Sequence, residues 1–394
     1  MTLTPFFDPL FQTFFQPLRL NTFFFDGTAV AAAKPPCACR RPALMFDCWI
    51  KYEPKRFSSQ GGEMRKLCAG LVVFAWSAAT PVTAAELVPG LLFDMGGKFD
   101  KSFNEAAYNG AEAFKKKTGI EYLEFEPTNE AQREQALRRM ARRGANIIVG
   151  VGFSQTSAIE TVAKEYPDVK FTLIDGVTEA PNVQSIVFKE HEGSFLVGML
   201  AAMASKTGKV GFVGGMDIPL IRKFACGYEQ GAKHAKAGTE VLVNMTGNTS
   251  AAWNDPTKGG ELARSQFDRG ADIVFAAAGA TGVGVYQAAK DGGKLAIGVD
   301  SNQNHLHPGT MLSSMVKRVD VAIEEAFTDA MNGAWKPGLK VLGLAEDGVG
   351  WALDDNNRSL VSAEMESALG AAREAIVAGE IKVTDYSAGN SCDY

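Results

Sequence analysis

Residues 87–119 read LVPGLLFDMGGKFDKSFNEAAYNGAEAFKKKTG. They begin with a short apolar run that ends at Phe93, continue through a loop with two glycines, and then show the apolar spacing of an amphipathic helix over 103–118. A short apolar run bounded by turn residues is typical of a strand. We therefore expect a strand, a loop and a helix in that order, which is the repeating unit of parallel α/β sheets.

The same alternation continues along the chain. Further strand-like runs are expected at 122–125, 146–149, 171–174, 184–188, 210–213, 241–243, 273–275 and 295–297. Helix-length segments separate most of these runs, at 103–118, 129–143, 155–165, 219–236, 255–269 and 281–292. Strands that alternate with helices predict parallel sheets with helices on both faces.

The alternation starts anew near residue 190, and each half has the four or five strands of one doubly wound domain. We therefore expect an α/β protein of two doubly wound lobes with a ligand cleft between them; a single sheet of nine strands is the alternative. Helix-like segments at 317–333 and 361–379 would carry the chain back between the lobes through a hinge of several crossings. The predicted lobes are 87–189 with about 316–345, and 190–315 with about 346–394.

The composition is that of a globular protein, with 46% hydrophobic and 22% charged residues in a chain of 394. It excludes a disordered chain, a collagen and a protein with many membrane spans. The first 85 residues hold nine Lys and Arg and five Asp and Glu, which leaves 31 basic and 40 acidic residues downstream. This acidic excess disfavours binding of nucleic acid, which requires a basic face.

Residues 64–85 have the three parts of a secretory signal peptide: a basic start at 64–66, an apolar run at 67–79 and small residues up to the predicted cleavage after Ala84 or Ala85. The apolar run is shorter than the roughly 20 residues that a membrane-spanning helix needs. We therefore expect export to the periplasm. A buried helix of a cytosolic domain would explain neither the basic start nor the small residues.

Residues 1–63 do not form a recognisable domain, because aromatic runs such as Phe23–Phe25 follow neither the helical nor the strand period. Our hypothesis is that Met64 begins the natural protein and that the extension is a gene-model artefact. The extension holds three cysteines, Cys37, Cys39 and Cys48. A metal site formed by them is disfavoured because they lack a fourth ligand.

Cysteines are sparse after the expected cleavage, since only Cys226 and Cys392 remain. An oxidising compartment would allow them to pair. Cys226 lies within a predicted helix and Cys392 near the end of the chain, so the sequence favours two unpaired thiols. Cys68 stands at the start of the apolar run and not after it, so its position does not support a lipid anchor.

Asp94 and the following loop come at the carboxyl end of the first predicted strand. In an open parallel sheet the carboxyl ends of strands line the ligand crevice, so we expect Asp94 to face it. Ser102 is expected to cap the next helix, with Glu105 completing a capping box. Phe103 then stands at the edge of the crevice, where position alone leaves a core role and a ligand contact equally open.

A series of motifs surrounds these residues. Asp94-x-Gly96-Gly97 precedes Asp100-Lys101-Ser102-Phe103-Asn104 and Gly110, and the later motifs are Gly152-Phe153, Phe224-x-x-Gly227-x-x-x-Gly231, Trp253-x-Asp255-Pro256, Ala278-Gly279-x-x-Gly282, Gly298-Val299-Asp300 and Val316-Lys317-Arg318. Together, over about residues 88–345, they resemble the basic membrane protein family of ABC-transporter substrate-binding proteins, of the purine-nucleoside-binding type. The resemblance implies a fold like that of type I periplasmic binding proteins.

The resemblance also implies a function without catalysis or cofactor. A monomer would bind a nucleoside in the cleft by hinge closure and deliver it to an ABC permease in the inner membrane. In the family's nucleoside binders two aromatic rings hold the base, an Asp contacts it, and an Asp and a Lys hold the ribose. The implied ligand site comprises Asp94, Phe103, Asn104, Phe153, Trp253, Gly279, Asp300 and Lys317.

The chemistry of these residue types agrees with that ligand. Stacking a purine on an aromatic face contributes about 1–3 kcal/mol. A carboxylate at a strand end, here Asp300, can accept both hydroxyls of a vicinal diol. Lys317 could donate to the same sugar, and we expect Asp300 to be its nearby counter-charge. A binder or sensor of another diol-bearing small molecule remains an alternative.

An oxidoreductase is the alternative of a different class. Gly279-Ala280-Thr281-Gly282-Val283-Gly284 precedes Asp300 by about twenty residues, close to a dinucleotide fingerprint. Tyr286-x-x-x-Lys290 imitates a dehydrogenase acid–base pair, but we expect both to be surface residues. Export would also separate the protein from the NAD of the cytosol.

His305 and His307 lack the carboxylates or cysteines of a metal site. Ser154 and Ser301 lack a histidine at a recognised spacing.

Overall fold

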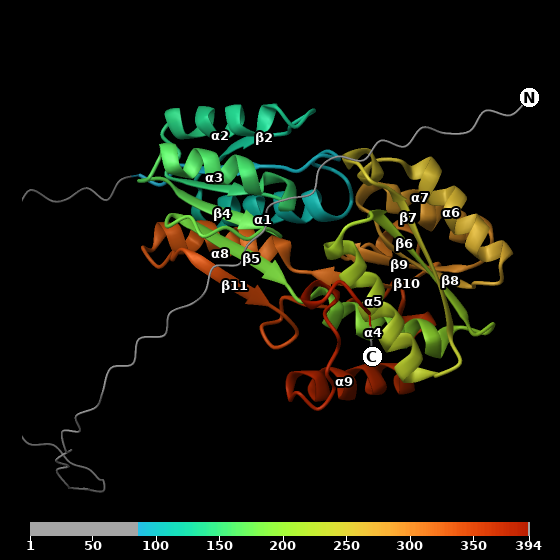
Figure 1. Cartoon of the computed structure of the whole chain (residues 1–394). Helices are drawn as coiled ribbons and strands as arrows, with labels where there is room; N and C mark the ends of the chain where they lie inside the picture. Colours follow the sequence, from blue (N-terminus) through green and yellow to red (C-terminus); the bar gives the residue numbers. More distant parts are fainter. Residues whose placement is uncertain (1–85, 393–394) are drawn as a thin grey trace, which may run out of the picture. The chain divides into compact units, whose positions relative to one another are not determined.

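Two six-stranded sheets organise residues 86–392, the part of the chain that the computed structural model describes (Figure 1). The expectations for residues 1–63 and for a signal peptide at 64–85 lie outside the described residues. The first sheet has the strand order β11-β5-β4-β3-β1-β2. Its strands are β1 (Pro89–Leu92), β2 (Leu123–Phe125), β3 (Ile147–Gly150), β4 (Lys170–Ile174), β5 (Val183–Phe188) and β11 (Gly338–Leu342).

The second sheet has the order β12-β10-β9-β8-β6-β7. Its strands are β6 (Lys209–Met216), β7 (Glu240–Gly247), β8 (Ile273–Ala277), β9 (Leu295–Asp300), β10 (Met311–Lys317) and β12 (Val349–Trp351). Neighbouring strands are parallel in both sheets, except that β12 runs antiparallel to β10. The carboxyl ends of the parallel strands therefore gather at one edge of each sheet.

Helices cover both faces of each sheet (Figure 1). Successive strand residues point to opposite faces, so Leu92 packs with α2 and α3 while Leu91 joins the cluster that contains α1 and α8. In the second sheet α6 and α7 cover one face, and α4 and α5 the other. The helices are α1 (Phe103–Thr118), α2 (Gln132–Arg142), α3 (Thr156–Glu165), α4 (Glu190–Ala204), α5 (Pro219–Ala235), α6 (Pro256–Asp268), α7 (Gly282–Asp291), α8 (Val319–Met331) and α9 (Ala363–Val377).

This architecture confirms the predicted fold class, α/β with two doubly wound lobes. We call the first sheet and its helices the N-terminal lobe, and the second sheet and its helices the C-terminal lobe. The chain passes between the lobes after β5, after β10 and after β11. Backbone hydrogen bonds hold these passages side by side: Lys189 N–H donates to the Leu342 carbonyl (2.9 Å) and Arg318 N–H to the Gly348 carbonyl (2.8 Å).

Four elements were not predicted from the sequence: the strands β10, β11 and β12 and the helix α4. Residues 311–317 form β10, so the helix expected to begin at 317 starts at Val319 instead. Helix α4 was not predicted as a helix at all. Thirteen of its fifteen residues are buried, and it is apolar on nearly all sides after its first turn, so it lacks the periodic stripe that reveals a surface helix.

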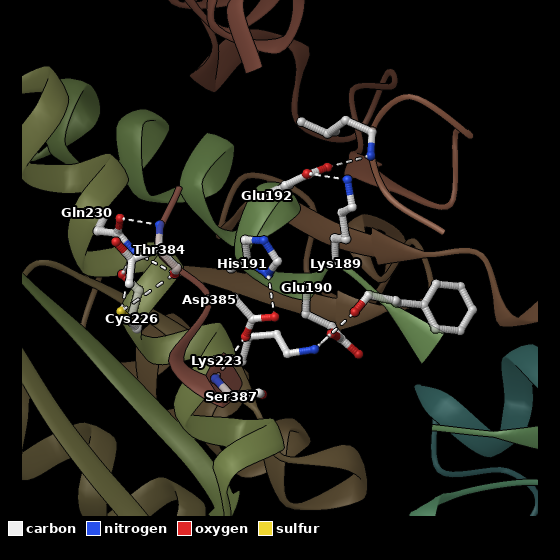
Figure 2. A network of polar contacts seen from close by, with 12 residues as sticks. Lys189, Glu190, His191, Glu192, Lys223, Cys226, Gln230, Thr384, Asp385 and Ser387 are labelled. Atoms are coloured by element: carbon white, nitrogen blue, oxygen red, sulfur yellow. Dashed lines mark hydrogen bonds and ion pairs between the residues drawn. The ribbon is translucent and has the colours of Figure 1, made fainter. Parts of the chain in front are cut away.

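The prediction of two unpaired thiols is wrong, because Cys226 and Cys392 form a disulfide. After α9 the chain turns back across α5, the helix that carries Cys226. Gln230, one turn further along α5, donates to the Thr384 carbonyl (3.0 Å) and accepts from the Thr384 N–H (2.8 Å), as Figure 2 shows. These contacts bring the end of the chain to a helix 166 residues earlier.

Candidate functional site

A cavity lies between the two lobes at the carboxyl ends of strands from both sheets. The empty space inside it, its opening to solvent included, is about 560 Å³. The structure brings all eight candidate ligand contacts to its wall: Asp94, Phe103, Asn104, Phe153, Trp253, Gly279, Asp300 and Lys317. Residues far apart in the sequence thus meet in one space.

Aromatic side chains line the cavity from both lobes. Phe103 is the first residue of α1, and Trp253 ends the 3-10 turn Ser250–Trp253; both are half-buried. The indole ring of Trp253 lies against Gly215 of β6, where a Cβ atom would be 2.1 Å from a ring carbon. Gly215 therefore leaves the space that the indole ring occupies.

Asp94 lies two residues beyond β1 and is almost fully buried. Its Oδ1 accepts hydrogen bonds from the Ser154 hydroxyl (2.5 Å) and the Met95 N–H (2.8 Å), and Arg133 Nη2 is 3.9 Å away. Burial raises the pKa of Asp94, although the two hydrogen bonds and the positive charge of Arg133 lower it. Gly152 approaches so closely that a Cβ atom there would lie 2.2 Å from Asp94 Oδ2.

The predicted capping box of Ser102 and Glu105 is wrong. Asp100 accepts from the N–H groups at the start of α1 instead: Oδ1 from Ser102 (2.8 Å) and Glu105 (3.1 Å), and Oδ2 from Asn104 (3.0 Å). A carboxylate at a helix N-terminus is also favoured by the helix dipole. The Ser102 hydroxyl is thereby released from capping and donates to Asp300 Oδ2, 2.5 Å away in the other lobe.

Asp300 ends β9 and is almost fully buried. Its backbone is left-handed, with φ 61°, a conformation that is uncommon for non-glycine residues. Burial raises the pKa of Asp300 to about 6, although Lys317 and the hydrogen bond from Ser102 lower it. The carboxylate is therefore a desolvated acceptor at the wall of the cavity.

Lys317 lies at the end of β10 among carboxylates from both lobes. Its Nζ is 2.5 Å from Asp175 Oδ2 and 3.0 Å from Glu190 Oε1. Glu190 in turn accepts from Lys223 of α5 (2.9 Å), a contact drawn in Figure 2. Asp175 and Glu190 are thus the ion-pair partners of Lys317, while the expected counter-charge, Asp300, attracts it from a longer distance. Burial of the ammonium lowers the pKa of Lys317, but the attraction of the surrounding carboxylates outweighs burial, so the pKa is raised and the group stays charged.

Asp175 is a lining residue that the sequence analysis missed. It follows β4, adopts a left-handed φ of 65°, and has an almost fully buried side chain. Its Oδ1 is buried and has no hydrogen-bond partner among the described residues. Burial raises the pKa of Asp175 to about 6, although the positive charge of Lys317 lowers it. Its place at the end of a predicted strand was the available signal.

The charges of the cavity wall are unequal. One ammonium, Lys317, faces four carboxylates: Asp94, Asp100, Asp175 and Asp300. Ionised carboxylates accept hydrogen bonds and donate none, so they suit a ligand rich in hydroxyl and N–H groups. They repel a phosphate or a carboxylate.

The acid–base pair of the competing enzyme hypothesis, Tyr286 and Lys290, does not line the cavity, although Gly279 and Asp300 of the same hypothesis do. Tyr286 is fully buried, contrary to the expected surface position, and its hydroxyl donates to Gln303 Oε1 (2.8 Å); Lys290 is exposed. His305 is exposed and His307 half-buried. Within residues 86–392 no cluster of metal-ligating side chains occurs. Over the same residues, no helix has both the length and the apolar character needed to cross a bilayer.

Comparison with known proteins identifies the family of the chain. The family model Bmp, described as ABC transporter substrate-binding protein PnrA-like, matches residues 88–387. An uncharacterized lipoprotein of Pyrococcus abyssi is 38% identical over 288 residues, covering 70% of this chain and 71% of the relative. The ABC transporter nucleoside-binding protein BmpA of Lactococcus lactis is 30% identical over 321 residues, covering 76% and 89%.

A solved structure shares the fold. The solute-binding protein of an ABC transporter system from Aeropyrum pernix K1 superposes with a TM-score of 0.70 at 30% identity, covering 76% of this chain and 94% of that one. Members of the matched family bind a small molecule for an ABC transporter and are not enzymes. Because this family model matches the chain across both lobes, the chain belongs to the Bmp family of PnrA-like ABC transporter substrate-binding proteins.

Proposed function

We propose that the protein binds a purine nucleoside in the cavity between its lobes and delivers it to the permease of an ABC importer. The observation that carries the proposal is that aromatic rings and hydrogen-bond-accepting carboxylates from both lobes line one cavity. The name of the Lactococcus lactis relative, a nucleoside-binding protein, supports the same ligand class.

The base would lie between Phe103 and Trp253, which come from different lobes. Asp94 would accept an N–H of the base through Oδ2, since its Oδ1 already accepts from Ser154 and Met95. Asp300 would accept the ribose hydroxyls. The excess of carboxylates in the wall would favour a nucleoside over a nucleotide, because a phosphate would be repelled.

Binding would proceed by hinge closure about the three passages of the chain between the lobes. A ligand that contacts Asp94 and Phe103 on one side and Trp253 and Asp300 on the other stabilises the closed form more than the open form. The ligand therefore signals its presence to the permease through the position of the lobes.

A sugar or another diol-bearing ligand is the second candidate. It is favoured by the polar end of the cavity, where Asp175 Oδ1 and Asp300 could each accept a hydroxyl. It would leave Phe103 and Trp253 without a flat partner, which is why the nucleoside is preferred.

Titration calorimetry tests the proposal. We expect inosine, guanosine or adenosine to bind, and the matching 5′-monophosphate, free ribose and 2′-deoxynucleoside to bind at least tenfold more weakly. Trp253→Ala should cost about 1–3 kcal/mol of binding free energy through lost stacking. Trp335→Phe is the control, because Trp335 donates to Thr172 and does not line the cavity. Binding of ribose but of no nucleoside would establish the second candidate.

The proposed function also implies a location for the protein. We infer that it works on the outer side of the cytoplasmic membrane, as a substrate-binding protein of an importer must. The Pyrococcus abyssi relative is named a lipoprotein, a name that implies a lipid anchor in that protein, whereas the position of Cys68 predicts an unanchored form here. Detergent-free release of the native protein with the periplasmic fraction would support the unanchored form predicted from Cys68.

A further inference from the structure

Two loops of opposite lobes touch directly at the edge of the ligand cavity. One is the segment 100–102, which precedes α1, and the other is the segment 299–303, which follows β9. Besides the hydrogen bond from the Ser102 hydroxyl to Asp300 (2.5 Å), the Ser301 hydroxyl donates to the Ser102 carbonyl (2.9 Å). Gln303 Nε2 donates to the Lys101 carbonyl (2.7 Å).

The donor from the C-terminal lobe is held rigidly. Gln303 is fully buried, and its Oε1 accepts from the Val299 N–H (2.7 Å) and from the Tyr286 hydroxyl (2.8 Å). Its Nε2 is therefore fixed in the direction of the other lobe. This contact gives Tyr286 a structural role, since the hydroxyl orients the amide that reaches Lys101.

Both loops carry backbone strain at the point of contact. Lys101 has φ 63° and Asp300 has φ 61°, each in the left-handed region that non-glycine residues avoid. Such strain persists where neighbouring contacts over-determine the conformation, and it is concentrated at ligand clamps and switches. Asp100 supplies one such contact, because it accepts from the Ser102 N–H (2.8 Å).

The contact between segments 100–102 and 299–303 separates two open spaces. Asp300 lines the ligand cavity on one side and, on the other, a second interlobe groove of about 1,110 Å³, opening included, together with Lys101 and Ser301. The lobes thus meet here through a narrow wall of polar groups and not through a packed apolar core. Hydrogen bonds of this kind can form and break as the lobes approach and separate.

We propose that segments 100–102 and 299–303 form an interlobe latch, in which Ser102 is a positioning residue that fixes Asp300 for the ligand when the lobes close. This inference rests on the proposed hinge closure. The latch stabilises the closed form by itself and leaves the second oxygen of Asp300 to the ligand. Closure of the lobes and binding of the ligand therefore use the same carboxylate, that of Asp300. Closure favours ligand binding, and ligand binding favours closure.

Three single substitutions separate the latch from local effects. Ser102→Ala removes the bond to Asp300, and Ser301→Ala removes a bond between the lobes that does not involve Asp300. Ser154→Ala is the matched control, because its hydroxyl also donates to a lining carboxylate at 2.5 Å, that of Asp94, but within one lobe. Far-UV circular dichroism of each variant checks that it is folded.

Hydrogen exchange of the ligand-free full chain measures opening. The reporting peptide is 277–283, which lines the cleft but contains no latch residue. Ser102→Ala and Ser301→Ala should speed its exchange about tenfold, as expected for loss of one strong hydrogen bond, and Ser154→Ala should leave it unchanged. Equal exchange in the wild type and both latch variants would overturn the proposal, as would an equal increase in all three variants.

Measurements of ligand binding by the same variants test the latch and the proposed function separately. If guanosine binds, its dissociation should be about tenfold faster from Ser102→Ala, with a smaller change in the association rate. If no nucleoside binds while both latch variants still speed exchange at 277–283, the latch stands and the proposed ligand fails. If guanosine binds but exchange does not respond to either latch variant, the ligand stands and the latch fails.

Discussion

Asp300 combines three properties that rarely coincide in one side chain: burial, a left-handed backbone and a carboxylate with a pKa raised to about 6. The raised pKa means that the cavity disfavours the ionised form, because burial outweighs the attraction of Lys317. A ligand whose hydroxyls donate to the carboxylate would stabilise that ionised form. Ligand binding and proton release are then coupled.

The first prediction concerns this coupling. Because the ligand lowers the pKa of Asp300 from about 6, affinity should rise as pH increases from 5 towards 7 and be constant above. Calorimetry in buffers of different ionisation enthalpy would measure the released proton. Asp300→Asn should reduce the slope but not abolish it, since burial also raises the pKa of Asp100 and of Asp175 to about 6. Identical slopes for the variant and the wild type would remove Asp300 from the site.

Lys317 supplies a second prediction at the same scale. Its removal in Lys317→Met would leave Asp175 and Glu190 as buried charges without their shared partner, at a cost of about 3–5 kcal/mol in unfolding free energy. Lys340→Met is the control: it breaks an exposed pair with Glu325 of similar length, 2.8 Å, and should cost about 0–1 kcal/mol. Urea denaturation measures both. Equal losses would mean that the buried network does not stabilise the fold.

Among the elements, the C-terminal segment 378–392 depends most on a covalent link. The disulfide from Cys392 and the hydrogen bonds of Thr384 to Gln230 attach it to α5. Its Asp385 comes within 4.0 Å of His191, near the first passage between the lobes (Figure 2). The segment therefore borders the hinge.

We expect Cys226→Ser and Cys392→Ser to loosen this segment equally, although Cys226 is buried and Cys392 is half-buried. Loss of a native disulfide commonly costs about 2–5 kcal/mol. Limited proteolysis followed by mass spectrometry should show new cleavage within 378–392 in both variants and in the reduced wild type. A loss of stability confined to Cys226→Ser would instead indicate a packing defect in α5.

The elements also show where sequence analysis succeeds. The nine predicted strands all occur, because each is a short apolar run between turn residues, and β1 was located from the run that ends at Phe93. The β10 strand escaped notice because Ser313 and Ser314 interrupt its apolar pattern. Helix α4 escaped notice for the opposite reason, since it is buried on almost every side.

At the scale of the whole molecule, the strand-end position predicted that Asp94 faces the crevice, but most other members of the candidate site could be listed only by resemblance, because they are scattered along the chain. The geometry then added three features that the sequence analysis had not found. Asp175 lines the cavity, Asp100 replaces Ser102 as the cap of α1, and Ser102 reaches Asp300 in the other lobe. The Asp100 cap is local to residues 100–105, whereas the contact of Ser102 with Asp300 depends on how the two lobes face each other and so on the tertiary structure.

The three passages between the lobes have a further consequence, for the order in which the protein can be completed during synthesis. The N-terminal lobe emerges first from the ribosome, yet its edge strand β11 and its helix α8 are encoded after most of the C-terminal lobe. Until Gly338–Leu342 is made, β5 has no neighbour on that side. Neither lobe is a continuous fragment, so a chain truncated before residue 338 leaves both sheets without their last strand.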